Sequence, residues 1–149
     1  MRALVQRVSE GHVFVKEHSY LEKIRKGMVI LLGVSEDDSE KEAMFVSEKC
    51  ANLRIFENEN EKMNLSVKDI NGEVLIISQF TLYGDTRKGN RPSFNKAAKP
   101  ELAENLYKFF VSEMKKHLGN SKIKEGIFGT MMEVKIINDG PVTVLVESK

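Results

Sequence analysis

Polar side chains interrupt a buried strand pattern near the middle of the chain. Residues 74–77 form a continuous apolar run with β-branched side chains, which is typical of a strand inside a sheet. Ser78, Gln79 and Thr81 then place hydroxyl and amide groups where a core strand carries none. A buried polar group without a partner costs roughly 1–3 kcal/mol, so these groups are either hydrogen-bonded or in use. The stretch is either a strand that surfaces at its end, or a site whose backbone N–H groups and hydroxyls face a polar substrate.

A strongly basic segment follows this stretch directly. Residues 86–99 contain no acidic side chain, and Gly89 and Pro92 favour a loop. The basic residues are Arg87, Lys88, Arg91, Lys96 and Lys99. Such a run usually forms a solvated surface, but arginine and lysine beside glycine amides also suit phosphate groups. The loop is therefore either a solvated surface or a binding segment for an anionic substrate.

The remaining residue types argue against metal- and cofactor-based chemistry. The three histidines, His12, His18 and His117, lie far apart, and none has a metal-ligand spacing with a cysteine or an acid. The glycines never reach the spacing of a phosphate loop or a dinucleotide fingerprint, and no serine stands in a nucleophile elbow. We therefore expect neither a metal nor a cofactor. An enzyme of this kind would rely on backbone groups, a hydroxyl and the substrate itself.

Length and composition predict one domain over residues 1–149. The net charge is +1, so any nucleic-acid contact would need a local patch, and Cys50 is the only cysteine. The absence of an internal disulfide fits a reducing compartment. No apolar run approaches the roughly 20 residues of a membrane span, and residues 1–8 do not resemble a signal peptide. We predict a cytoplasmic protein without a membrane segment.

Strand and helix patterns are mixed without regular alternation, which favours one layered α/β or α+β domain. A capping box formed by Ser39 and Glu42 predicts the start of a helix in which Cys50 is a core residue. A second helix is expected over residues 100–118, with Pro100 at its first position and a glycine after its end.

Turn signals predict three chain reversals between short strands. The expected turns are residues 9–11, 71–72 and 139–141. The second reversal has an Asn-Gly pair and is the strongest hairpin signal of the three. Arg7, inside the first predicted strand, is expected at a sheet edge or facing solvent.

Five segments resemble, in order and over nearly the full length, signature blocks of the D-aminoacyl-tRNA deacylase family. The segments are residues 1–8, 78–85, 88–94, 126–132 and 138–143. Each block alone is weak, but five in the same order are specific. The resemblance implies a mixed α/β fold, a single-domain β-β-α layered sandwich that forms a homodimer. It also implies hydrolysis of the ester between a D-amino acid, or glycine, and the terminal adenosine of tRNA, without a cofactor.

The resemblance also revises the interpretation of the third turn. In the family, the pair that corresponds to Gly140 and Pro141 forms a cis peptide and reaches into the pocket of the partner subunit. Its carbonyl oxygens would accept hydrogen bonds from the substrate α-ammonium group and so fix the Cα atom. An L side chain would then strike backbone, whereas a D side chain would point to solvent, so selection would tolerate many D-amino acids.

Two versions of the catalytic step follow from the resemblance. In the first, backbone N–H groups near Phe80 and Thr81, helped by Ser78 or Gln79, hold the developing oxyanion while the ribose 2′-hydroxyl assists water. In the second, Thr81 is a nucleophile that forms an acyl-enzyme. We favour the first, because no base is visible that would activate Thr81. The residues expected to support the pocket or bind tRNA are Arg7, Lys88, Arg91, Phe94, Phe128, Met131 and Met132.

Two alternatives remain open from the residues. The protein could be a non-catalytic RNA-binding module that uses the basic residues of segment 87–99, although it has no aromatic stacking platform of the RNA-recognition type. It could also be a dimeric binding protein for free D-amino acids, which would leave the basic loop unexplained.

Overall fold

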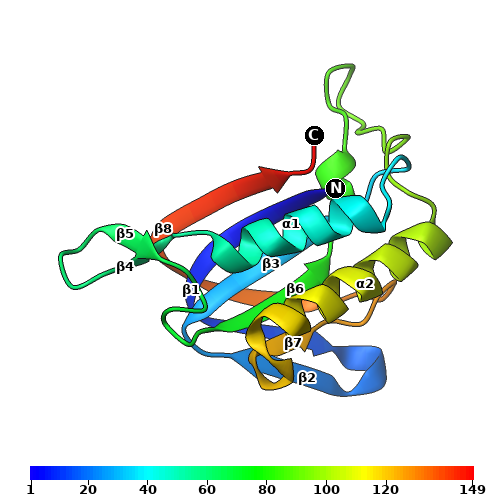
Figure 1. The fold of residues 1–149 in the computed structure, drawn as a ribbon. Helices are drawn as coiled ribbons and strands as arrows, with labels where there is room; N and C mark the ends of the chain where they lie inside the picture. Colours follow the sequence, from blue (N-terminus) through cyan, green and yellow to red (C-terminus); the bar gives the residue numbers. More distant parts are fainter.

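A computed structural model describes residues 1–149 and shows a layered α/β fold (Figure 1). In chain order the elements are β1 (Arg2–Val15), the 3-10 turn η1 (Lys16–His18), β2 (Tyr20–Ile24), β3 (Gly27–Gly33), α1 (Glu40–Asn52), β4 (Phe56–Glu57), β5 (Met63–Leu65), β6 (Glu73–Ser78), the 3-10 turn η2 (Phe80–Tyr83), α2 (Pro100–Leu118), the 3-10 turn η3 (Asn120–Lys122), β7 (Ile123–Glu125) and β8 (Glu133–Glu147). Neither helix has a stretch long and apolar enough to span a bilayer.

The main sheet is built around β3 and β6, which pair in parallel. Strand β6 also pairs in parallel with β7, and β1 pairs antiparallel with β2, β3 and β8. Because parallel neighbours need crossover connections, α1 links β3 toward β6 and α2 links β6 toward β7. Both helices lie side by side on one face of the sheet (Figure 1). The carboxyl end of β6 therefore leads directly into the connection that contains α2, after the connection that contains α1 has led into its amino end.

Successive residues of β6 face two different hydrophobic cores, which explains its unbroken apolar sequence. Val74 and Ile76 belong to the core beneath the helices, together with residues such as Phe110. Leu75 and Ile77 belong to a second core on the opposite face. The second core is completed by β1, β2 and the partly buried side chains of β8. The layers are thus helix, sheet and second strand layer, which confirms the predicted fold class.

The structure confirms both predicted helices. Ser39 and Glu42 form the capping box of α1, and α2 begins at Pro100 and ends before Gly119. Cys50 is fully buried in the core, and burial raises the pKa of its thiol to about 12. A thiol in this environment stays protonated, so Cys50 acts as a core residue.

None of the three predicted turns joins two strands that pair with each other, so the hairpin predictions are wrong. Strand β1 runs unbroken through residues 9–11, where Gly11 allows close packing against Val29 and Ile24. The turn at residues 71–72 exists, but β5 pairs with β4 instead of β6. Strand β8 continues through residues 139–141, and both of its halves pair with β1 across a register shift.

Candidate active site

A cleft of about 850 Å³ opens at the carboxyl end of β6. Ser78, Gln79, Phe80 and Thr81, the four predicted catalytic residues, all line it. The opposite walls come from the end of the basic segment and from the segment that precedes β8. These walls contain Phe94, Ala97, Ala98, Pro100, Phe128, Gly129, Thr130, Met131 and Met132. The cleft thus collects residues from three separate parts of the chain.

The polar stretch after β6 forms a tight turn rather than a longer strand. The Gln79 N–H still bonds to the Leu32 carbonyl at 2.8 Å, and the chain then turns into η2. Inside η2, the first hydrogen bond is donated by Leu82 to the Gln79 carbonyl at 3.3 Å. The N–H groups of Phe80 and Thr81 precede this bond and have no acceptor within the turn, as at any helix start. Two adjacent amides at the edge of a cleft are suited to bind developing negative charge.

The Thr81 hydroxyl is held by an amide and not by a base. The Gln79 side chain donates from Nε2 to Thr81 Oγ1. No histidine or carboxylate is hydrogen-bonded to Thr81, and no group of three or more His, Cys, Asp or Glu side chains is placed to hold a metal. A nucleophilic hydroxyl needs an adjacent base or metal. The geometry therefore favours chemistry by the backbone amides over attack by Thr81.

Aromatic and sulfur-containing side chains give the cleft apolar walls. The Phe80 and Phe94 rings meet edge to face with centroids 5.2 Å apart, and Phe80 is 56% exposed. Met131 is 86% exposed, while Phe128 packs 5.9 Å from the Tyr107 ring. Large exposed apolar groups gathered in a cleft mark a ligand-binding surface, and flat rings suit a nucleobase.

The basic segment carries its charges away from the cleft. Asp85 and Ser93 form a backbone bridge that closes the loop. Hydrogen bonds from the Arg87 guanidinium hold the pKa of Asp85 well below its usual range, so Arg87 is already paired. Lys88 and Arg91 are exposed, form no ion pair and do not line the cleft. The loop therefore lines the cleft at its base and presents free positive charge at its tip.

Arg7 is buried, contrary to the prediction of a solvent-facing side chain. It is 6% exposed and donates from Nη1 to the Ile55 carbonyl at 2.8 Å and from Nε to the Asp139 carbonyl at 2.9 Å. The neighbouring Gly140–Pro141 bond is cis, and both residues are exposed. None of these residues lines the cleft of its own chain. Arg7 thus fixes the segment before Gly140 and is not placed as a surface contact for RNA.

Sequence reasoning missed the small residues of the cleft. Ala97, Ala98 and Ala103 line it opposite η2. They are brought there by α2 and by a backbone bridge between Ser35 and Ala97, with Ala98 also donating to the Val34 carbonyl at 2.9 Å. Alanine carries no chemical group, so only the tertiary structure reveals its contribution.

Comparison with known proteins gives a consistent result over the whole chain. The family model described as D-Tyr-tRNA(Tyr) deacylase matches residues 4–147. A D-aminoacyl-tRNA deacylase of Koribacter versatilis is 54% identical over 149 residues, which cover 100% of this chain and 98% of the relative. A solved structure described as a c-Myc DNA unwinding element binding protein is 42% identical, with a TM-score of 0.93, and the match covers 100% of this chain and 99% of the other. Another, described as "a probable eukaryotic D-amino acid tRNA deacylase", shares the fold with a TM-score of 0.82 at 17% identity, covering 98% of both chains.

Proposed function

The chain belongs to the D-Tyr-tRNA(Tyr) deacylase family, and from this premise we propose how its cleft acts on the substrate. The protein is a D-aminoacyl-tRNA deacylase, a hydrolase that cleaves the ester between a D-amino acid and tRNA in translation proofreading. Our proposal concerns the residues that perform this reaction, the accepted acyl groups and the dimer.

The η2 turn is the catalytic centre of the proposal. The observation that carries it is that the N–H groups of Phe80 and Thr81 have no backbone acceptor and belong to residues that line the cleft. They bind the oxyanion that forms as water attacks the ester carbonyl, and the substrate 2′-hydroxyl assists the water. An aminoacyl ester is an activated bond, so preorganised donors can supply a large part of the stabilisation that it needs.

The apolar walls of the cleft and the exposed lysine and arginine of the basic loop bind the acceptor end of the tRNA. The apolar rings of Phe80, Phe94 and Phe128 stack against the terminal adenosine, because every base offers a flat π-face. Lys88 and Arg91 lie on the exposed tip and contact backbone phosphates, which position the RNA without reading its sequence. Charged tRNA is used where translation occurs, so the proposal places the protein in the cytoplasm.

Selection of the acyl group comes from a second subunit. Gly140 and Pro141 are exposed and do not line the cleft of their own chain, so they are free to reach the cleft of a partner in a homodimer. Their carbonyl oxygens accept from the substrate α-ammonium group, and Arg7 fixes the preceding carbonyl. This arrangement excludes L side chains by contact with backbone. Glycine has no side chain to exclude, so glycyl-tRNA is also a substrate.

Thr81→Val is expected to leave turnover of D-tyrosyl-tRNA within about tenfold of the wild-type rate, because it removes one hydrogen bond and keeps the amide. Valine matches the shape of threonine, so η2 should keep its conformation. Single-turnover hydrolysis measures the rate of the chemical step. A fall of several orders of magnitude would instead identify Thr81 as a covalent nucleophile.

The proposed function is tested by following ester loss from D-tyrosyl-tRNA, L-tyrosyl-tRNA and glycyl-tRNA at equal concentrations. We expect hydrolysis of the first and third and little of the second. A thousandfold preference requires only about 4 kcal/mol, which one steric clash can supply. Binding of all three without cleavage would support the RNA-binding module. Binding of free D-tyrosine without any effect of tRNA would support the binding-protein alternative.

A further inference from the structure

We propose that Arg2 is a positioning residue of the deacylase, which fixes the far end of η2 and thereby the direction of its two free amides. The proposal rests on the function proposed above for those amides. Arg2 belongs to β1 and does not line the cleft. It therefore acts through the turn and never touches the reacting atoms.

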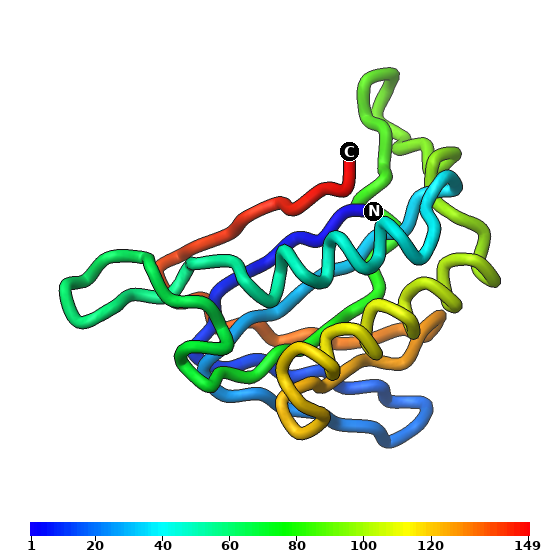
Figure 2. The backbone as a smooth tube through the Cα atoms, in the orientation of Figure 1, coloured from blue at the N-terminus to red at the C-terminus, as the bar shows by residue number.

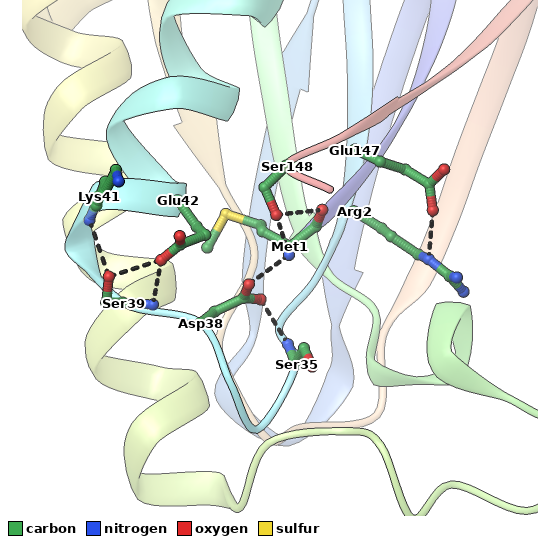
Figure 3. A network of polar contacts seen from close by, with 9 residues as sticks. All are labelled: Met1, Arg2, Ser35, Asp38, Ser39, Lys41, Glu42, Glu147 and Ser148. Carbon is green, nitrogen blue, oxygen red and sulfur yellow. Dashed lines mark hydrogen bonds and ion pairs between the residues drawn. The ribbon is translucent and has the colours of Figure 1, made fainter.

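The Arg2 guanidinium makes three contacts, two with the end of η2 and one with the end of β8. Its Nη1 donates to the Leu82 carbonyl at 2.9 Å. Its Nε donates to Glu147 Oε1 at 2.7 Å (Figure 3). Its Cζ lies 4.7 Å from the centre of the Tyr83 ring, within the range of a cation–π contact. One planar group thus joins the end of β8 to two consecutive residues of the turn.

The turn needs such an external contact because its own bonds are few. A 3-10 turn has poorer hydrogen-bond geometry than an α-helix, and its last carbonyl groups have no N–H donor within the turn. The Leu82 carbonyl lies two peptide units after the Thr81 N–H in a turn of only four residues, so we expect a shift of this carbonyl to alter the orientation of that N–H. Burial raises the pKa of Tyr83 to about 12, so the ring beside the guanidinium stays neutral.

The backbone around Arg2 is held in place by its neighbours. Its backbone pairs with Gly33 on one side and with Glu147 on the other. The preceding Met1 ammonium group bonds to Asp38 Oδ1 at 2.5 Å, and Asp38 Oδ2 accepts from the Ser35 N–H at 2.7 Å (Figure 3). The two ends of the chain lie close together here (Figure 2), and the Ser148 N–H donates to the Met1 carbonyl at 3.1 Å. The guanidinium is therefore held by a rigid part of the fold.

A role of Arg2 in positioning η2 can be distinguished by experiment from a general contribution of Arg2 to stability. The Arg2–Glu147 pair is 38% exposed on both side chains, and exposed ion pairs contribute little to the free energy of unfolding. Arg25 offers a matched control, because it pairs with Glu73 at 3.4 Å on an exposed surface and does not contact η2. A difference between the two arginines therefore reports on the turn.

Arg2→Ala is expected to lower kcat for D-tyrosyl-tRNA about tenfold, with KM within about twofold, because misplaced catalytic groups slow the chemical step. Arg2→Lys keeps one donor for the Leu82 carbonyl, so its kcat is expected to be about three times that of Arg2→Ala. Arg25→Ala is expected to keep both constants. Hydrogen exchange of the peptide that covers residues 78–85 should be faster in Arg2→Ala than in Arg25→Ala.

The proposal is overturned if Arg2→Ala keeps the wild-type kcat and exchange rate. It is also overturned if KM rises while kcat is unchanged, since Arg2 would then bind tRNA directly. A wild-type protein without deacylase activity would instead refute the proposed function, while the exchange measurement would still show whether Arg2 holds η2. Unchanged exchange at residues 78–85 in Arg2→Ala rejects the proposal whatever the activity.

Discussion

Gly140→Ala is expected to lower kcat/KM for D-tyrosyl-tRNA by about a hundredfold, because a displacement near 1 Å at a substrate-positioning group has an effect of this size. Gly140 has φ of +130°, a conformation that L side chains rarely adopt. A Cβ atom added there would lie 2.9 Å from Arg7 Nη2 and 3.0 Å from the Val142 nitrogen. The backbone must therefore shift, and with it the carbonyl groups that we propose for binding the substrate ammonium. Initial rates on D-tyrosyl-tRNA measure the loss.

Gly119→Ala is the matched control for the backbone effect. Gly119 ends α2 with φ of +94°, and an added Cβ would meet no atom within 4 Å. Both substitutions place alanine in a left-handed conformation, but only one of them displaces the segment next to Arg7. We expect Gly119→Ala to lose some stability and to keep its activity. Equal losses of activity in the two variants would trace the Gly140 result to general destabilisation.

Mixed dimers test whether Gly140 acts in its own cleft or in that of its partner. One subunit carries Gly140→Ala, and the other carries Phe80→Pro in the cleft. If the segment acts across the dimer, the mixed form contains one complete site, built from the intact cleft of the first subunit and the intact segment of the second. Random mixing makes half of the dimers mixed, so about a quarter of the wild-type activity should return. Activity that stays at the level of the separate variants would place Gly140 within its own subunit's site.

The helices were predictable because their signals are local. Ser39 and Glu42 bond to each other across one turn, and Pro100 marks its helix start without reference to other elements. The hairpins failed because glycine and proline show where a chain can bend and not which strands then pair. Gly11 serves close packing inside β1, and β8 pairs with β1 on both sides of Gly140. Strand pairing depends on contacts between distant segments, which a short turn motif does not encode.

The candidate site was predictable in part for the same reason. Ser78 and Thr81 stand out because polar groups directly follow a buried strand. That Phe94 and Met131 join them at one cleft followed only from the family resemblance, since distant parts of the chain bring them together. Neither the burial of Arg7 nor the contact of Arg2 with η2 had a local signal, because sequence does not show which arginine finds a carbonyl partner.

Phe80→Pro is expected to lower kcat by about 10²–10³, the usual effect of removing one donor from an oxyanion hole. Proline has no N–H, and it is tolerated at the first position of a helical turn, where that group has no internal partner. Phe80 occupies this position in η2. The substitution therefore removes the proposed donor while the rest of the turn can persist. Pre-steady-state hydrolysis of D-tyrosyl-tRNA measures the effect on the chemical step.

Phe80→Ala distinguishes the contribution of the Phe80 amide from that of the Phe80 ring. Both substitutions remove the aromatic side chain that packs against Phe94, and only proline removes the N–H. Alanine is therefore expected to raise KM by weakening stacking on the terminal adenosine, with a much smaller effect on kcat. The ratio of the two kcat values isolates the amide, just as Thr81→Val isolates the hydroxyl. Equal kcat values for the proline and alanine variants would remove the Phe80 amide from the mechanism and leave the Thr81 amide to bind the oxyanion alone.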